Sequence, residues 1–167
     1  MSKTIKVNLS TSSIEKAIRE IEDYKEDLKF KVSIFVQKLA EIGIETIDAN
    51  KYSIGSSDFS DLHPYYVHVE PNKVTLVLSG KDVAFIEFGA GVYYNTPVGT
   101  SPNPLGQKLG LTIGSYGLGK GRYNLWFYKN ESGEIVSTHG TKAAMPMSKA
   151  EEEIIKRFVS VAKEVFK

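Results

Sequence analysis

The chain has 167 residues, of which 41% are hydrophobic and 25% charged, and its formal net charge is +1. These values fit one globular domain, and the balanced charge excludes a general electrostatic attraction to nucleic acid or to an anionic membrane. The absence of cysteine excludes disulfides and thiolate catalysis. No signal-peptide pattern and no membrane-spanning apolar run is present, so we expect a protein made in the cytoplasm.

A helical pattern dominates the N-terminal third of the chain. Ser12 and Glu15 have the spacing of a capping box, in which each side chain satisfies a free backbone N–H at a helix start. Apolar residues then recur at helical spacing, with no proline, to about residue 49. A helix of about 35 residues would be about 50 Å long, more than one domain of this size can cover. Either the helix breaks, near Lys29 or Gly43, or another subunit buries part of its apolar stripe.

Alternating apolar residues predict strands elsewhere in the chain. The expected strands are residues 4–9, 65–69, 74–78, 83–88, 125–129 and 134–138. Pro71-Asn72 and the segment from Asn130 to Gly133 have turn composition, so successive strands would be antiparallel neighbours. Both faces of residues 83–88 are apolar except at Glu87, which indicates a covered strand.

The C-terminal stretch predicts a second helix. Ser148 and Glu151 repeat the capping-box spacing, and apolar residues from Ile154 to Phe166 form a helical stripe. We therefore expect one α+β domain over residues 1–167. It would hold a long N-terminal helix, an antiparallel sheet of about five or six strands, and a C-terminal helix packed on the sheet.

Residues 95–121 form the most unusual segment of the chain. Seven of the 14 glycines and three of the six prolines fall within it. So long a glycine-punctuated segment is usually functional or disordered. Folded back as a hairpin it could extend about 45 Å, so we interpret it as an assembly arm. Deletion of residues 100–118 is then expected to leave the fold intact and to block assembly.

A phosphate-binding function for this loop is a weaker interpretation. Gly114, Gly119 and Lys120 match the pattern G-x-x-x-x-G-K, but Gly121 replaces the required Ser or Thr. A strand-like aromatic run follows where the motif needs a helix N-terminus to face the phosphates. Basic and aromatic side chains in and beside the loop could still grip a nucleic-acid backbone without reading its sequence. Those side chains are Lys108, Tyr116, Lys120, Arg122 and Tyr123.

Catalytic and metal-binding patterns find little support in the sequence. The three histidines, His63, His68 and His139, have no ligand spacing, and no nucleophile motif is present. Glu87 stands out as a carboxylate in an apolar run, where a salt bridge at a strand end or an interface is its plainer explanation. We therefore expect no catalytic residue, no metal site and no cofactor.

Aromatic residues flank both ends of the loop, which is typical of an interface or of a core. Together with the loop they give the predicted interface. Its residues are Tyr93, Tyr94, Pro97, Leu105, Lys108, Leu111, Tyr116, Lys120, Arg122 and Trp126.

Three segments carry a resemblance to a known family. They are F-I-E-F-G-A-G-V-Y-Y-N at 85–95, N-L-W-F-Y at 124–128, and T-H-G-T-K-A-A-M-P-M-S-K-A at 138–150. In this order they resemble the small tail-completion, or head–tail joining, proteins encoded among the neck genes of long-tailed bacteriophages. The similarity covers residues 13–167. It departs from the family at residues 52–62, where a Pro-x-x-Thr-Gly-x-Leu stretch is replaced by Y-S-I-G-S-S-D-F-S-D-L.

The resemblance implies a non-enzymatic structural protein of the virion that completes the tail or joins it to the capsid. Phe88, Gly89 and Gly91 would shape the start of the loop, and Gly140 and Pro146 would set the turn into the last helix. The implied partners are other neck and tail proteins, DNA in the channel, and further copies of the chain. The copies would form a ring, with six as one candidate size, while the isolated chain would be monomeric. The alternative is a small nucleic-acid- or nucleotide-binding protein that uses the basic glycine-rich loop.

Overall fold

The computed structural model describes residues 4–51, 61–89, 101–109, 126–130, 132–138 and 142–167. In chain order the elements are α1 (Thr11–Lys51), β1 (His63–Glu70), β2 (Lys73–Ser79), α2 (Val83–Phe88), α3 (Pro104–Lys108), β3 (Trp126–Lys129), β4 (Ile135–Thr138) and α4 (Pro146–Val165). None of the described helices combines the length and the apolar character needed to cross a membrane.

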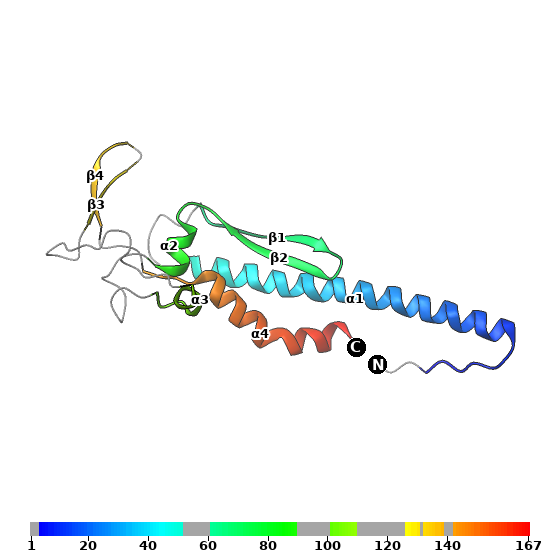
Figure 1. Ribbon diagram of the computed structural model, residues 1–167. Coiled ribbons are helices and arrows are strands. Elements are labelled where there is room, and N and C mark those ends of the chain that lie inside the picture. The colour runs from blue at the N-terminus through cyan, green and yellow to red at the C-terminus, as the bar shows by residue number, and fades with distance from the viewer. Residues whose placement is uncertain (1–3, 52–60, 90–100, 110–125, 131, 139–141) are drawn as a thin grey trace.

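Helix α1 runs without a break through 41 residues, a length of about 60 Å (Figure 1). It passes Lys29 and Gly43 unbroken, so the alternative of a broken helix is wrong. Its start is fixed by Ser10, whose hydroxyl accepts a 3.3 Å hydrogen bond from the Ser13 backbone N–H. The helix therefore begins before Ser12, and the predicted capping box at Ser12 is wrong.

The described strands form two separate antiparallel hairpins, β1–β2 and β3–β4, instead of one sheet of five or six strands. In the first hairpin Tyr66 lies opposite Leu76 across the Pro71-Asn72 turn, as the alternation predicts. In the second, Gly133 lies in the segment predicted as a turn and has a positive φ of 80°, a left-handed conformation that suits glycine. Residues 4–9 form no strand. The expected sheet is therefore wrong, although the fold remains α+β.

The segment predicted as a covered strand, residues 83–88, is the short helix α2. A short apolar run has no clear period, so tertiary contacts decide its conformation. Asp82 adopts the left-handed conformation at φ 55° and turns the chain into the helix. Ile86 is then buried in a small core with Leu62 and Ala144, and its carbonyl accepts the Ala144 N–H at 2.8 Å.

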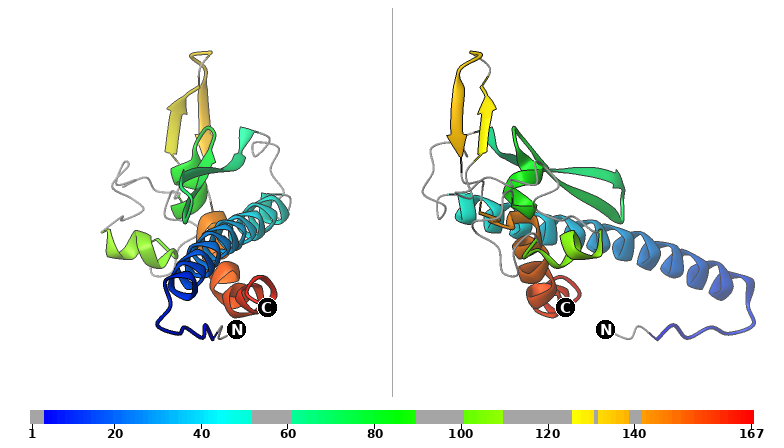
Figure 2. Two further views of the ribbon diagram at one scale, coloured as in Figure 1. Left: turned by 90° about the vertical axis from the view of Figure 1, so that its right-hand side faces the viewer. Right: turned by 60° about the vertical axis from the view of Figure 1, so that its left-hand side comes forward.

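Helix α4 packs on α1 and not on a sheet, which corrects the second part of the predicted architecture. The two helices run antiparallel, and the β1–β2 hairpin lies on another side of α1 (Figure 1, Figure 2). Phe35 and Leu39 of α1 are buried against Val161 of α4. The Phe35 ring also meets the rings of Phe158 and Phe166 at centroid distances of 5.1 and 5.7 Å.

The β1–β2 hairpin and α4 both come close to the α1 backbone at Gly43. A Cβ added there would lie 2.7 Å from Leu76 of the hairpin and 3.1 Å from Ile154 of α4. Glycine costs about 1 kcal/mol in a helix interior relative to alanine, so its presence here reflects the lack of space. Gly43 leaves room for both Leu76 and Ile154 to lie close to this part of α1.

An ion pair across the α1–α4 interface gives a pH-dependent prediction. Lys38 donates to Glu164 at 2.5 Å, and this hydrogen bond holds the pKa of Glu164 below its ordinary value of 4.5. A lowered pKa means that the pair stabilises the fold above the unfolded-state pKa and is lost as the pH falls through the folded-state pKa.

We therefore expect Glu164→Gln to lower the melting temperature slightly at neutral pH. The difference from the wild type should close in acid, because the wild-type pair is lost there as well. Thermal unfolding followed by circular dichroism over a pH series measures this difference, with the exposed Glu152→Gln as control. A gap that stays constant into strong acid would contradict the assignment of the effect to this pair.

Candidate functional site

A buried carboxylate joins three helices at one end of the molecule. Glu87 of α2 is only 7% exposed. Its carboxylate accepts hydrogen bonds from the Asn103 side-chain amide at 2.7 Å, from the Met147 N–H at 2.8 Å and from the Ser148 N–H at 3.0 Å. We call this group of contacts the Glu87 junction. Because a buried charge is tolerated only when it is well hydrogen-bonded, the junction fixes how α2, α3 and α4 meet.

The junction explains why α4 begins at Pro146. Met145 precedes the helix in the left-handed conformation, at φ 56°, and Pro146 occupies the first helical position. The next two residues carry free N–H groups that the helix cannot satisfy, and Glu87 accepts both. Its negative charge also suits the positive end of the helix dipole. The predicted capping box at Ser148 is therefore wrong, because a residue distant in sequence caps α4.

Part of the glycine-rich segment is held in the same place. Ser101 and Asn103 are almost fully buried, and the Ser101 hydroxyl donates to the Phe88 carbonyl at 2.7 Å. The Asn103 side-chain oxygen accepts the Leu105 N–H at 2.9 Å, which caps α3. A Cβ on Gly106 would lie 2.7 Å from the Ser101 hydroxyl, so the approach is close. Residues 101–109 are thus a docked helical segment and not part of an extended arm.

This docking changes the expected result of a loop deletion. Removing residues 100–118 would remove Ser101 and Asn103, and with them one of the three donors to the buried Glu87 carboxylate. Such a deletion is therefore no longer expected to leave the fold intact. Residue 100 and residues 110–118 of that segment lie outside the described residues.

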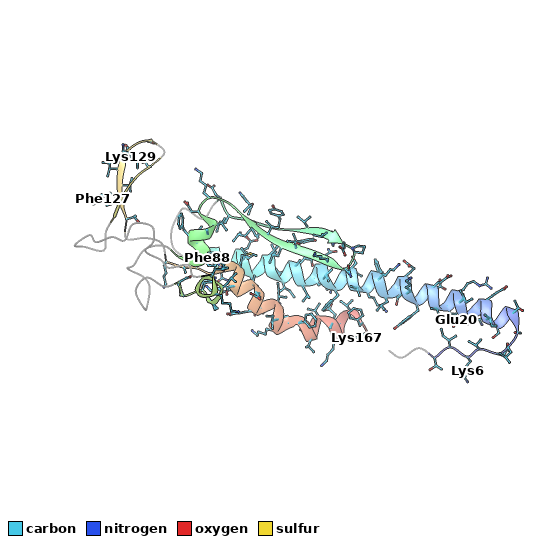
Figure 3. The ribbon with its side chains drawn as sticks, viewed as in Figure 1. Lys6, Glu20, Phe88, Phe127, Lys129 and Lys167 are labelled. Atoms are coloured by element: carbon cyan, nitrogen blue, oxygen red, sulfur yellow. The ribbon has the colours of Figure 1, made fainter. Side chains whose placement is uncertain are left out.

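The predicted structural residues that the structure describes lie around the junction. Phe88 ends α2, and Gly89 follows it at φ 78° with its N–H donated to the Phe85 carbonyl at 2.7 Å. Pro146 is fully buried at the start of α4. Figure 3 shows Phe88 where α2 meets α4. Gly91 and Gly140 lie outside the described residues.

The predicted interface residues are only partly described. Leu105 and Lys108 are exposed on α3, and Trp126 is the first residue of β3. Outside the described residues lie Tyr93, Tyr94, Pro97, Leu111, Tyr116, Lys120 and Arg122. The same holds for the phosphate-binding pattern at Gly114, Gly119, Lys120 and Gly121.

The described side chains show no arrangement suited to acid–base or metal chemistry. Every oxygen contact of Glu87 named above is to a donor of the protein itself, so the carboxylate has a structural role. Within the described ranges no three His, Asp or Glu side chains come together as metal ligands. An open groove of 490 Å³ between α1 and α4 is lined by charged residues, among which Glu153 is paired with Arg157 at 2.6 Å. That hydrogen bond lowers the pKa of Glu153.

Exposed apolar side chains are the feature that the structure shows most plainly. They lie on the first half of α1, on the outer face of β1–β2, on the β3–β4 hairpin and on α4. The described residues include Ile14, Ile18, Ile21, Leu28, Tyr65, Val67, Val69, Phe127, Ile135, Ile155, Phe158 and Val159. Figure 3 shows Phe127 on a hairpin that stands apart from the helices. Exposed apolar side chains that gather on one face, as along the first half of α1, mark interaction sites.

Sequence analysis missed Ser101 and Asn103, although one signal was present. In S-P-N-P, Asn103 followed by Pro104 is the pattern of an N-cap residue before a proline at the first helical position. That pattern predicts α3. It does not predict that the Asn103 amide also reaches Glu87.

Comparisons with models of known families, with characterised proteins and with solved structures find no match. The resemblance to tail-completion proteins therefore stays a prediction based on the quoted motifs.

Proposed function

We propose that the chain is a structural subunit of a tailed phage or prophage, which completes the tail or joins it to the capsid. In this proposal several copies assemble with other neck and tail proteins, as a ring around the DNA channel. The observation that carries it is the spread of exposed apolar side chains over α1, α4 and both hairpins.

The architecture supports an assembly role in two further ways. A two-stranded hairpin leaves backbone hydrogen-bonding groups free along both of its edges, and another chain can pair with them. The first half of α1 extends past both layers that cover its second half (Figure 1). Covering these surfaces with neighbouring subunits would lower the free energy of the assembly.

The family motifs acquire a physical role under this proposal. F-I-E-F-G supplies Glu87, and A-M-P-M-S supplies the two N–H groups that its carboxylate accepts. The two motifs thus hold one junction together. The junction stabilises the frame from which the exposed surfaces project.

Inactivation of the gene in the phage or prophage that carries it tests the proposal. We expect lysates to contain DNA-filled heads and separate tails, because the joint between them is incomplete. Electron microscopy of the lysate measures the fraction of joined particles, and the wild-type gene supplied in trans should restore it. Joined, infectious particles at the wild-type level in the absence of the protein would contradict the proposed function.

A further inference from the structure

The exposed stripe on α1 belongs to residues 11–31, which we call the overhang. Ile14, Ile18, Ile21 and Leu28 are spaced alternately by four and three residues or by their sum, which places them on one helix face. The same spacing continues into Phe35 and Leu39, which α4 covers. Beyond α4 the stripe stays exposed, since Ile21 is 55% exposed and Figure 3 shows Lys167 at the end of α4 well short of Glu20. Residues 4–10 of the same chain run back beside the start of α1 (Figure 1), and Ala17, on the flank of the stripe, is buried.

Helix α4 has an exposed apolar stripe of its own, beside the face that it packs on α1. Ile155 is 66% and Val159 59% exposed. Ala162 and Phe166 continue this stripe at the same three- and four-residue spacing, and both are partly buried because they also pack against the core of Phe35, Leu39 and Val161. We call these four residues the outer stripe of α4.

We propose that the overhang of one copy packs antiparallel on the outer stripe of α4 in a second copy of this chain. In one register the apolar residues meet in three successive layers. Ile21 lies beside Val159 of the second copy, Ile18 beside Ala162, and Ile14 beside Phe166. This inference rests on the proposed function and names the contact between subunits of the assembly.

Most charges on the flanks of the two stripes match in this register; the exception is Lys29, which lies level with Lys149 of the second copy. On one flank Glu22 lies level with Lys156 of the second copy, and Glu15 lies level with Lys163. All four of these residues are exposed. Such pairs contribute little affinity, but they set register and partner choice.

The other flank is complementary as well. Tyr24 lies beside Phe158 of the second copy, and Lys31 lies level with Glu151. Two core layers are mixed, since Lys25 lies opposite Ile155 and Leu28 lies opposite Glu152 of the second copy. Lys25 can therefore place its aliphatic stem on Ile155 and its ammonium near that carboxylate.

Pairing of two overhangs with each other fits less well. In the two antiparallel registers that keep both overhangs clear of α4, Glu22 faces either Glu22 or Glu15 of the other copy. Like charges at these flanking positions oppose pairing, although Glu15 faces Lys29 in the register that brings Glu22 to Glu22. That register also places each Lys25 opposite Ile21 of the other copy in the core. The charge pattern therefore favours α4 as the occupant.

The contact joins two different surfaces, so it propagates head to tail and closes into a ring if the rotation between copies allows it. Phe35 of α1 lies against Phe166 of its own α4. In the proposed contact Ile14 of the other copy's α1 lies at the height of that same Phe166. Successive α1 helices are therefore parallel and offset by about 20 residues, or about 30 Å along the axis.

Mixed disulfide formation between two single-cysteine variants tests the contact, since the chain has no cysteine of its own. Ile21→Cys protein is mixed with Val159→Cys protein, both purified and full length, and oxidised. The matched control replaces Ile21→Cys by Asp23→Cys, which lies at the same height on the opposite face of α1. We expect the mixed dimer to form at least about tenfold faster than the control dimer, because the contact raises the local thiol concentration.

Two results would overturn the inference. The first is a mixed dimer that forms no faster than the control. The second is Ile21→Cys protein cross-linking to itself faster than to Val159→Cys, which would assign the overhang to a second overhang.

A charge exchange provides an independent check on the register. Glu15→Lys/Glu22→Lys in the cysteine variant should return cross-linking to the control rate, and Lys156→Glu/Lys163→Glu in the other partner should restore it. The matched pair Asp23→Lys/Glu26→Lys, on the far side of α1, should leave the rate unchanged. If these variants fail to cross-link as expected but joined particles still require the gene, the proposed contact is wrong and the proposed function stands. If the cross-link forms as expected but particles are normal without the gene, the contact stands and the proposed function is wrong.

Discussion

Glu87→Ala is expected to lower the free energy of unfolding by about 3 kcal/mol. The substitution removes a buried acceptor and leaves the Met147 and Ser148 N–H groups and the Asn103 amide without it. Each buried donor left unsatisfied costs about 1–3 kcal/mol, and relaxation with entry of water reduces the sum. Urea denaturation of the purified protein measures the change.

The matched control for this variant is Glu152→Ala, which removes an exposed glutamate of α4 and should cost under about 0.5 kcal/mol. Hydrogen exchange adds a local readout: amides at the start of α4 should lose protection in Glu87→Ala, while those around Phe35 and Leu39 keep theirs. A cost below about 1 kcal/mol for Glu87→Ala would contradict the structural role given to the junction.

Gly43→Leu is expected to destabilise the protein by about 3 kcal/mol. The added side chain would occupy the space beside Gly43 that Leu76 and Ile154 already fill. It would therefore force the hairpin and α4 away from α1. Chemical denaturation gives the magnitude, and the intensity of the helical circular dichroism shows that α1 itself persists.

Gly43→Ala separates packing from helix propensity at the same position. Its Cβ would meet the end of the flexible Leu76 side chain at 2.7 Å, which can move, while alanine gains about 1 kcal/mol of helix propensity. We therefore expect Gly43→Ala to be near neutral. A leucine variant as stable as the alanine variant would show that the two layers do not meet closely at Gly43.

The sequence predicted the parts of the fold that depend on local pattern. The helical stripe of α1, the β1–β2 alternation around Pro71-Asn72 and the turn at Gly133 are each specified by residues near in the chain. The strand predicted at residues 83–88 was wrong because five apolar residues around Glu87 fit a strand or a helix equally, and contacts of Ile86 with distant residues decide between them. The predicted sheet of five or six strands was wrong in part for the same reason.

The Glu87 junction could be predicted only in part. Sequence analysis singled out Glu87 as an unusual carboxylate but expected a salt bridge, whereas its partners are two backbone N–H groups about 60 residues away and an amide. No periodic pattern encodes such a cap, because the donor helix and the acceptor lie on separate elements. The start of α4 was displaced for the same reason.

The sequence also left undecided whether α1 is one continuous helix. A continuous helix makes the overhang a surface that the same chain leaves largely uncovered, as Ile18 and Ile21 show. Sequence alone could not decide this, since glycine at position 43 is compatible with both a break and a close contact. In the structure α1 runs through Gly43 without a break, and Leu76 and Ile154 lie close to that glycine.

Mass spectrometry of purified phage particles tests the central claim most directly. If the chain is a neck or tail subunit, it should copurify with infectious particles at several copies each, in a constant ratio to the capsid protein across the gradient. Absence of the protein from infectious particles, or a ratio that varies across the particle peak, would contradict a structural role in the virion.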